Sequence, residues 1–503
     1  MSRCATPAPR APEMGDEELL GGLQRLLQRL NELPDTREPR PTVLGQHVAD
    51  FLGREAHDLP VTRDTVGRHR LADVSTALDS LAAEDPDAEL IGVSGGQERN
   101  HEDFSAFLRH RYAAFSPGPV DYSAAATGPD TSRQVVSFGI HLLHVDSEPV
   151  AVLLRGAAPM YGREAVTIEA LAATPETGAA LLAEVRRRMN ALSHIRGQVV
   201  SFTPDEFGQG AGGFTFLRRP EVAASDVILP EGLLARVAGH VVDIGVHSAS
   251  LRASGQHLKR GVLLYGPPGT GKTLTVQHLL TATPERTAIL LQGGSLQFVA
   301  EAARLARAMA PALLVFEDID LIAMERGMFG GPQPLLFEIL DALDGVGEDA
   351  DIAFLMTTNR ADLLEPALAA RPGRVDLAVE IPLPDVAARR RLFRLYGERS
   401  SLSGAALDAA AERAEGVTAS FAKELIRRTV LRAVLGGRDA RDEDLAEALD
   451  EMLDTRDQLT RTLLGSNPAL LEADDAVSTS GSFGWSPLGG GPTPDEGEPA
   501  DGV

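Results

Sequence analysis

Unbroken apolar runs of strand length recur through the middle of the chain, at residues 261–265, 312–320 and 352–358. None of them alternates between apolar and polar positions, and the second ends in acidic residues. A strand that is apolar on both faces is typical of a sheet covered by helices on both sides, because neither face meets water. The helical pattern of residues 274–280, directly after the first run, supports this arrangement. The middle of the chain is therefore predicted to be a layered α/β domain.

Further apolar runs lie before residue 220, in a region without recognisable chemistry. His141 and His144 are three positions apart on one of these runs, so their side chains point to opposite faces and predict no metal site. An α+β N-terminal accessory domain is predicted over residues 41–222, as a small sheet with a covering helix. The strand candidates are residues 133–145, 149–156, 164–171, 197–203 and 212–219, and the helix candidate is 177–195.

The segments outside these regions have other patterns. Residues 1–40 join a Pro/Ala-rich start to leucines at helical spacing between Leu19 and Leu33, which fits a short coiled coil between subunits or a helix packed on its own domain. Four helical runs over residues 386–454 predict a small helical bundle. The Gly/Pro/acid-rich residues 465–503 are predicted to be disordered.

One short motif carries chemistry. The chain has only three lysines, Lys259, Lys272 and Lys423, among 48 basic residues, and Lys272 lies in GPPGTGKT between a strand candidate and a helix candidate. This motif is a P-loop, and its position between a strand and a helix is the one that a P-loop requires. Its backbone N–H groups and the helix N-terminus are expected to face the phosphates. Lys272 is expected to reach the β- and γ-phosphates, and Thr273 to bind Mg²⁺. The predicted nucleotide-binding residues are Gly266, Pro267, Pro268, Gly269, Thr270, Gly271, Lys272, Thr273 and Leu274.

Acidic residues end the run at 312–320, in the sequence FEDID. P-loop ATPases place carboxylates at the end of such a strand, beside Mg²⁺ and the attacking water. Glu317 is therefore the predicted second metal ligand, and Asp318 the predicted base. A strand that simply runs into an acidic turn is the alternative.

The chain resembles the AAA clade of AAA+ ATPases over about residues 226–453, in the motifs GPPGTGKT, FEDID, LLFEILDALDG, MTTNR and LEPALAARPGRVD. The resemblance implies a P-loop NTPase αβα sandwich over residues 226–385, with the helices of 386–454 as its lid. It also implies that Asn359 is a sensor that positions the lytic water. Arg371 and Arg374 match the family's arginines that reach the nucleotide of a neighbouring subunit, so the resemblance implies a homo-oligomeric ring, usually a hexamer. Alternatively, these two arginines lie in a solvated turn or form a structural ion pair.

Two departures from the family pattern affect the expected activity. The acids stand in the order Glu317-Asp318 where most members have Asp-Glu, so the base is shorter by one methylene, about 1.5 Å. No aromatic–hydrophobic–Gly triplet of the substrate-gripping kind lies between residues 287 and 312, where Phe298 is the only aromatic residue and has the surroundings of a core residue. Threading of a polypeptide is therefore not supported, and Met328-Phe329 is a weaker candidate for a pore-facing pair.

Composition limits the partners. The net charge of −24 argues against nucleic acid or an anionic membrane as the main partner, because phosphate groups require a basic surface. The single Cys4 excludes a disulfide framework, and the sequence has neither a signal-peptide core nor a long apolar span, so a cytoplasmic protein is predicted. The favoured function is an ATPase that remodels a protein client, and the alternative is a nucleotide-gated scaffold with slow or no hydrolysis.

Overall fold

The computed structural model describes residues 40–204, 211–320, 339, 341, 350–362 and 375–454. These residues form two compact units, one within Met1–Arg218 and Glu285–Ala312 and the other within Arg219–Pro284 and Leu313–Val503. The predicted Leu-rich helix before residue 40, Met328-Phe329 and the tail at 465–503 lie outside the described residues.

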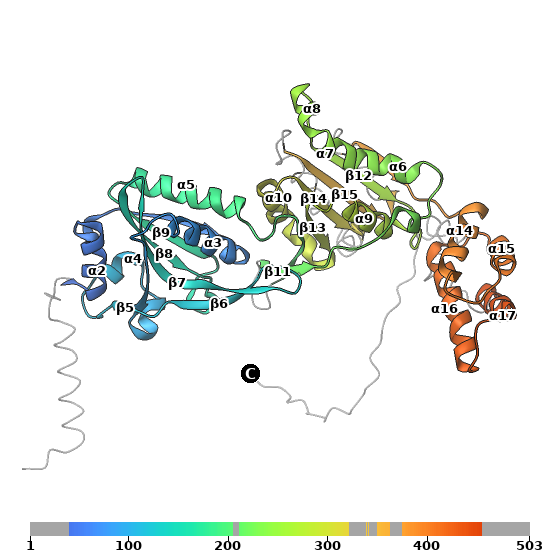
Figure 1. Cartoon of the computed structure of the whole chain (residues 1–503), viewed down its shortest axis with the longest axis horizontal. Coiled ribbons are helices and arrows are strands. Elements are labelled where there is room, and N and C mark those ends of the chain that lie inside the picture. Colours follow the sequence, from blue (N-terminus) through green and yellow to red (C-terminus); the bar gives the residue numbers. More distant parts are fainter. Residues whose placement is uncertain are drawn as a thin grey trace, which may run out of the picture. The chain divides into compact units, whose positions relative to one another are not determined.

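The first unit contains an antiparallel sheet in the order β2-β9-β8-β7-β3-β5, with β6 paired to β7. Strands β5 to β9 of this unit are labelled in Figure 1. The short strands β1 (Arg40–Pro41) and β4 (Arg109–His110) pair with each other. The short helical turns are η1 (Ala56–Asp58), η2 (Arg68–Arg70), η3 (Gly96–Asn100) and η4 (Pro159–Tyr161). The strands are β2 (Val61–Val66), β3 (Glu89–Ser94), β5 (Ser116–Gly118), β6 (Asp121–Ala126), β7 (Ser132–Val145), β8 (Glu148–Arg155) and β9 (Val166–Leu171), and the helices are α2 (Val43–Leu52), α3 (Leu71–Ala82), α4 (Phe104–Leu108) and α5 (Pro175–Ala191).

Helices cover both faces of this sheet, which explains why β8 is apolar at successive positions. Val150, Val152 and Leu154 pack into a core with α3 and α5, whereas Ala151 and Leu153 pack into a core with α2 and α4. Successive side chains of a strand point to opposite faces, so one strand supplies both cores. Three of the sequence-predicted strands, β7, β8 and β9, and the predicted helix α5 lie in this layer structure.

A second sheet has the strand order β11-β10-β13-β14-β15-β12-β16. Strand β12 pairs in parallel with β15 and with β16, and β10 pairs in parallel with β13 but antiparallel with β11. The strands are β10 (Val199–Pro204), β11 (Ala211–Leu217), β12 (Arg260–Tyr265), β13 (Thr287–Gln292), β14 (Ala312–Glu317), β15 (Ile352–Thr358) and β16 (Leu377–Glu380), and the helical segments along the chain here are α6 (Leu233–Ala238), the π-helical η6 (Gly239–Asp243), α7 (Ile244–Val246), α8 (Ser248–Ala253), α9 (Lys272–Thr281), η7 (Gly293–Phe298) and α10 (Val299–Ala308).

The placement of β10 and β11 corrects the sequence prediction, which assigned both to the N-terminal sheet. Val199, Val200 and Phe202 of β10 are all almost fully buried, so both faces of this strand need cover. That cover exists at the edge of the second sheet, where β10 lies beside β13 and Phe202 packs on Phe298 at a centroid distance of 5.8 Å. Phe298 is itself 4% exposed, which confirms it as a core residue.

Four helices follow the second sheet and form their own core (Figure 1). They are α14 (Val386–Gly397), α15 (Gly404–Arg413), α16 (Ala419–Leu435) and α17 (Asp442–Leu453). Asp385, Ser403 and Thr418 cap the first three by accepting a hydrogen bond from a backbone N–H of the first turn. These elements coincide with the predicted helical runs, while the exact limits of the lid as a domain stay a prediction.

Candidate nucleotide site

The P-loop lies between β12 and α9, as the sequence predicts. Its backbone depends on glycine, because Gly266 has φ 141° and a Cβ there would lie 2.3 Å from the carbonyl oxygen of Ile381. The loop ends at Gly271, also with positive φ, and α9 begins at Lys272. A helix N-terminus with free N–H groups therefore directly follows a loop that closely approaches its neighbours, which is the arrangement that binds phosphate.

The side chain of Lys272 is folded back onto the loop. Its Nζ donates hydrogen bonds to the carbonyl oxygens of Gly266, at 2.7 Å, and Pro267, at 2.8 Å. Burial lowers the pKa of Lys272 to about 8, although the negative charges of Asp318 and Asp320 act in the opposite direction. The residue is only 6% exposed, so its ammonium group is held inside the loop, close to carboxylates.

The other P-loop residues differ in exposure. Thr270 is 4% exposed and donates from Oγ1 to the carbonyl oxygen of Pro267 at 2.9 Å, which closes the loop on itself. Thr273 is exposed in the first turn of α9, and Leu274 is half-buried. An exposed hydroxyl beside Lys272 is accessible to a ligand, as its predicted role in binding Mg²⁺ requires.

Strand β14 ends at Glu317 and brings the predicted carboxylates next to β15. Asp318 has φ 50°, in the left-handed region, and its backbone N–H donates to Thr357 Oγ1 at 3.0 Å. Burial raises the pKa of Glu317, and the charge of Asp318 adds to this effect. Burial and the charge of Asp320 raise the pKa of Asp318, while Lys272 and a hydrogen bond from Asn359 oppose the rise. The structure thus brings the predicted metal ligand, base and sensor residues together with Lys272.

Asp320 is a residue whose role the sequence reasoning missed. It is 4% exposed, and its Oδ1 accepts hydrogen bonds from Thr358 Oγ1 and from the backbone N–H of Asn359, both at 3.0 Å. Its Oδ2 lies 3.5 Å from Asn359 Nδ2. The sequence shows that FEDID contains a third acidic residue. It does not show that this residue lies next to Asn359, the predicted sensor. Asp320 fixes the end of β15 and, with it, the side chain of Asn359.

The start of helix α16 contacts the P-loop. Ser420 N donates to the carbonyl oxygen of Gly269 at 3.2 Å, and a Cβ on Gly269 would lie 2.9 Å from Ser420 Oγ and 3.1 Å from Thr418 Oγ1. This contact joins the helices of the predicted lid to the P-loop. Lys423, one turn further along, is exposed. Arg371 and Arg374, the two predicted arginine fingers, lie outside the described residues.

Comparison with known proteins agrees with this geometry. The sequence model of the ATPase family associated with various cellular activities (AAA) matches residues 262–383. The proteasome-activating nucleotidase of Thermococcus onnurineus (strain NA1) is 30% identical over 280 residues, which are 53% of this chain and 70% of the relative. The chain belongs to the AAA family of ATPases.

Two other similar proteins differ from this nucleotidase, one because the chain covers a smaller share of its length and the other because its sequence identity is lower. ATP-dependent zinc metalloprotease FtsH 2 of Sphaerobacter thermophilus is 34% identical over 260 residues, which are 48% of this chain and 39% of the relative. The solved structure of the FIGL-1 AAA domain in complex with ADP is 21% identical, covers 51% of this chain and 90% of that domain, and has a TM-score of 0.41.

Membership in the AAA family confirms the predicted P-loop NTPase fold and the predicted activity of an ATP-binding and ATP-hydrolysing enzyme. The individual roles of Asp318, Asn359, Glu317 and the P-loop residues stay predictions. Among the described residues of this AAA ATPase, no helix combines the length and apolar character needed to cross a bilayer.

Proposed function

We propose that this AAA ATPase acts as a hexameric ring of identical subunits, in which ATP hydrolysis remodels a protein client bound by the N-terminal domain. The observation that carries the proposal is the cluster of Lys272, Glu317, Asp318 and Asn359 at the ends of β12, β14 and β15. Two relatives support it by their names, because one activates the proteasome and the other is an ATP-dependent protease.

In the proposed hydrolysis, the P-loop binds the phosphates and Lys272 exchanges its two carbonyl partners for phosphate oxygens. The hydroxyl of Thr273 and the carboxylate of Glu317 are the hard oxygen donors that Mg²⁺ prefers. When bound, this ion neutralises charge on the β- and γ-phosphates. Asp318, whose pKa is raised, takes the proton of the attacking water, and Asn359 orients that water.

The arginine pair explains why a ring is proposed. Arg371 and Arg374 are proposed to reach the nucleotide of the neighbouring subunit, where an arginine stabilises the charge of the transferring phosphoryl group. A subunit alone then lacks part of its active site. The acidic net charge of the whole chain favours a protein client over nucleic acid, and the cytoplasmic location predicted from the sequence stays a prediction.

A nucleotide-gated scaffold with slow or no hydrolysis is the second candidate. The Glu317-Asp318 order shortens the base by one methylene, and the left-handed backbone at Asp318 holds its carboxylate in an uncommon direction. In such a scaffold, ATP binding would assemble the ring and hydrolysis would only slowly release it.

Steady-state turnover per subunit, measured while protein concentration is raised through the assembly range, tests the proposal. We expect turnover to rise cooperatively and to collapse in Arg371→Ala, with the exposed Arg304→Ala as the matched control at wild-type rate. Sedimentation with a slowly hydrolysed ATP analogue gives the number of subunits. Turnover independent of concentration, or unchanged in Arg371→Ala, contradicts the shared site, whereas tight ATP binding with negligible turnover favours the scaffold.

A further inference from the structure

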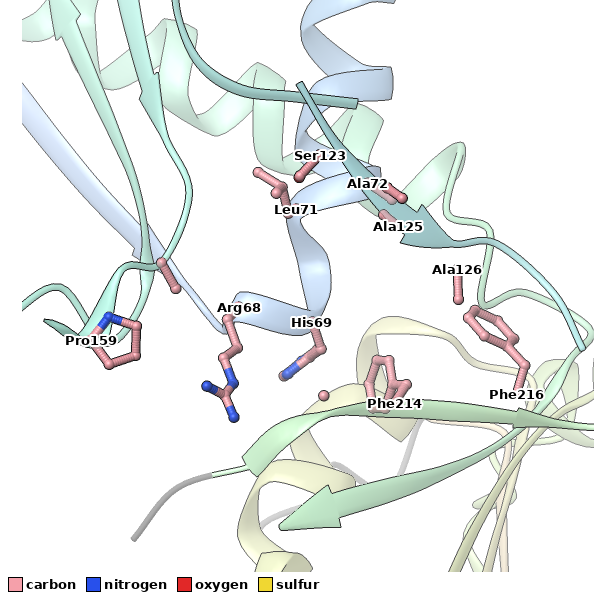
Figure 2. Close-up of a pocket in the computed structure, with 13 residues that line it drawn as sticks. Arg68, His69, Leu71, Ala72, Ser123, Ala125, Ala126, Pro159, Phe214 and Phe216 are labelled. Carbon is pink, nitrogen blue, oxygen red and sulfur yellow. The ribbon is translucent and has the colours of Figure 1, made fainter. Parts of the chain in front are cut away.

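Burial affects ionisable groups differently in two parts of the chain. In the first unit, a cavity of about 290 Å³ is lined mainly by apolar residues such as Leu71, Pro159 and Phe214, and no carboxylate is among its lining residues (Figure 2). At the nucleotide site, burial instead raises the pKa of two carboxyl groups, those of Glu317 and Asp318. A side chain that holds one of these carboxyl groups in place can therefore affect ATP hydrolysis without contacting ATP itself.

The backbone of Asp318 has a conformation that few residues other than glycine adopt. Among the described residues, the non-glycine residues with positive φ are Asp146, Ser147 and Asp318. Asp146 and Ser147 form the two-residue turn between β7 and β8, where a hairpin requires positive φ. Asp318, with φ 50°, instead follows directly after β14. The left-handed region costs conformational energy for a residue with a Cβ atom, so interactions with the surroundings must hold Asp318 there.

Thr357 of β15 supplies such an interaction. Its Oγ1 accepts a hydrogen bond from the backbone N–H of Asp318 at 3.0 Å, and its carbonyl oxygen accepts one from the backbone N–H of Ile319 at 3.1 Å. One residue therefore binds two successive N–H groups at the point where the chain leaves β14. Thr357 is 0% exposed, so packing fixes its side chain. Without the hydroxyl oxygen, the N–H of Asp318 would lose this acceptor, and its backbone could leave the left-handed region.

The carboxyl group of Asp318 lies among the groups that the proposed hydrolysis uses. Burial and the charge of Asp320 raise the pKa of Asp318, whereas the charge of Lys272 and a hydrogen bond from Asn359 lower it. The carboxyl group is therefore close to both the predicted sensor and the lysine of the P-loop. An aspartate is shorter than a glutamate by one methylene, so the position of its carboxylate depends more strongly on the backbone that carries it.

We propose that Thr357 is a positioning residue for ATP hydrolysis. Its hydroxyl oxygen holds the backbone of Asp318 in the left-handed conformation, and this conformation points the short carboxylate at the attacking water. The arrangement compensates for the missing methylene of the base, so the order Glu317-Asp318 is compatible with turnover. This inference rests on the proposed role of Asp318 as the base.

Steady-state ATPase kinetics of Thr357→Val test the inference, because valine has a similar shape and lacks the hydroxyl oxygen. We expect kcat to fall by roughly 10- to 100-fold, since a base displaced by about 1 Å costs on the order of a hundredfold in rate. KM for ATP should change by less than about threefold, because the substitution leaves the P-loop intact. Thr357→Ser keeps the acceptor and should bring kcat back to within about threefold of the wild type. The matched control is Thr429→Val, at a fully buried threonine of α16 whose Oγ1 donates to the carbonyl oxygen of Leu425 at 2.9 Å, and it should leave kcat unchanged.

A second background tests whether Thr357 acts through the base. In a chain that already carries Asp318→Asn, Thr357→Val should change the residual turnover by less than about threefold, because the carboxylate that it positions is absent. Circular dichroism and the unfolding temperature show whether each variant is folded. If Thr357→Val is not folded, Thr357→Ala is measured in its place, because alanine also removes the hydroxyl oxygen and is smaller.

The outcomes separate this inference from the proposed function. Wild-type kcat in a folded Thr357→Val or Thr357→Ala variant overturns the role of Thr357, and so does a loss of kcat in Thr357→Ser as large as in Thr357→Val. If Asp318→Asn loses turnover in the same assay, the proposed base stands and only the role of Thr357 fails. Wild-type turnover in Asp318→Asn excludes the base, and the inference fails with it. Negligible turnover of the wild-type chain contradicts the inferred compensation.

Discussion

Asp320 offers the sharpest test of what positions the residues of the nucleotide site. It forms hydrogen bonds with Asn359, the predicted sensor, and among the described residues it has no hydrogen bond to the P-loop. In Asp320→Asn, the amide oxygen can still accept from Thr358 Oγ1 and from Asn359 N, both now at 3.0 Å. The new NH₂ group, however, takes the position that faces Asn359 Nδ2, at 3.5 Å, where two donors cannot pair. We therefore expect the side chain of Asn359 to lose its fixed orientation.

The magnitude follows from these contacts. Hydrogen bonds to a charged group contribute about 1.5–3 kcal/mol and neutral ones about 0.5–1.5 kcal/mol, so two weakened bonds lower the free energy of unfolding by roughly 2 kcal/mol. A sensor displaced by about 1 Å costs on the order of a hundredfold in rate. We expect kcat to fall by roughly 10- to 100-fold while KM for ATP changes by less than about threefold, because the phosphate loop stays intact.

Steady-state ATPase kinetics and urea unfolding measure both effects. The matched control is Asp362→Asn, an exposed carboxylate that pairs with Arg360 at the surface and should change neither kcat nor stability measurably. A double variant with Asn359→Ala should lose much less than the product of the two single losses, because Asp320 acts mainly through Asn359 and only to a smaller extent through its charge on Asp318 and Lys272. The reasoning fails if Asp320→Asn raises KM and leaves kcat unchanged, or if the two substitutions are additive.

The remaining predictions concern binding, pH and the core. Lys272→Ala should abolish ATP binding in a fluorescence titration, while Lys423→Ala, at an exposed lysine, binds ATP like the wild type. Asp318→Asn should keep ATP binding and lose turnover; equal ATPase rates would exclude Asp318 as the base. The pKa of Asp318 is raised in the folded chain, so ionisation of this residue destabilises the fold at pH 8. Asp318→Asn should therefore raise the unfolding temperature at pH 8, and this gain in unfolding temperature should shrink as the pH falls toward 3.8. Arg260→Met removes the guanidinium group that pairs with Asp351 at 2.8 Å inside the core, so it should lower the free energy of unfolding by about 3–5 kcal/mol in chemical denaturation. A decrease below about 1 kcal/mol would contradict this expectation.

The sequence predicted which residues of the candidate nucleotide site lie near one another better than it predicted which strands pair. Gly266, Lys272 and Glu317 lie in a local motif or at the end of an apolar strand, so their positions depend on short-range chemistry that the sequence states directly. The interaction of Asp320 with Asn359 joins two residues 39 positions apart, and they meet only because β14 and β15 are neighbours in the sheet. No local pattern contains that information.

The strands β10 and β11 show the same limit at a larger scale. Their apolar patterns correctly predicted strands, but a pattern does not specify the sheet in which a strand pairs. Residues 121–126, which form β6, were not predicted as a strand, because Asp121, Ser123 and three alanines carry little strand propensity. Its pairing with β7 supplies the hydrogen bonds that its own side chains do not favour.

The hairpin of β10 and β11 also sets where this protein can be divided. A shortened chain that starts at residue 226 would leave the edge of β13 at Ala288, Ile289 and Leu290 without its parallel partner. Bare apolar edges invite pairing between molecules, so such a fragment is expected to aggregate even though it contains the complete P-loop. Modular exchange of the N-terminal part, in evolution or in the laboratory, therefore has its natural junction between α5 and β10, after Ala191 and before Val199.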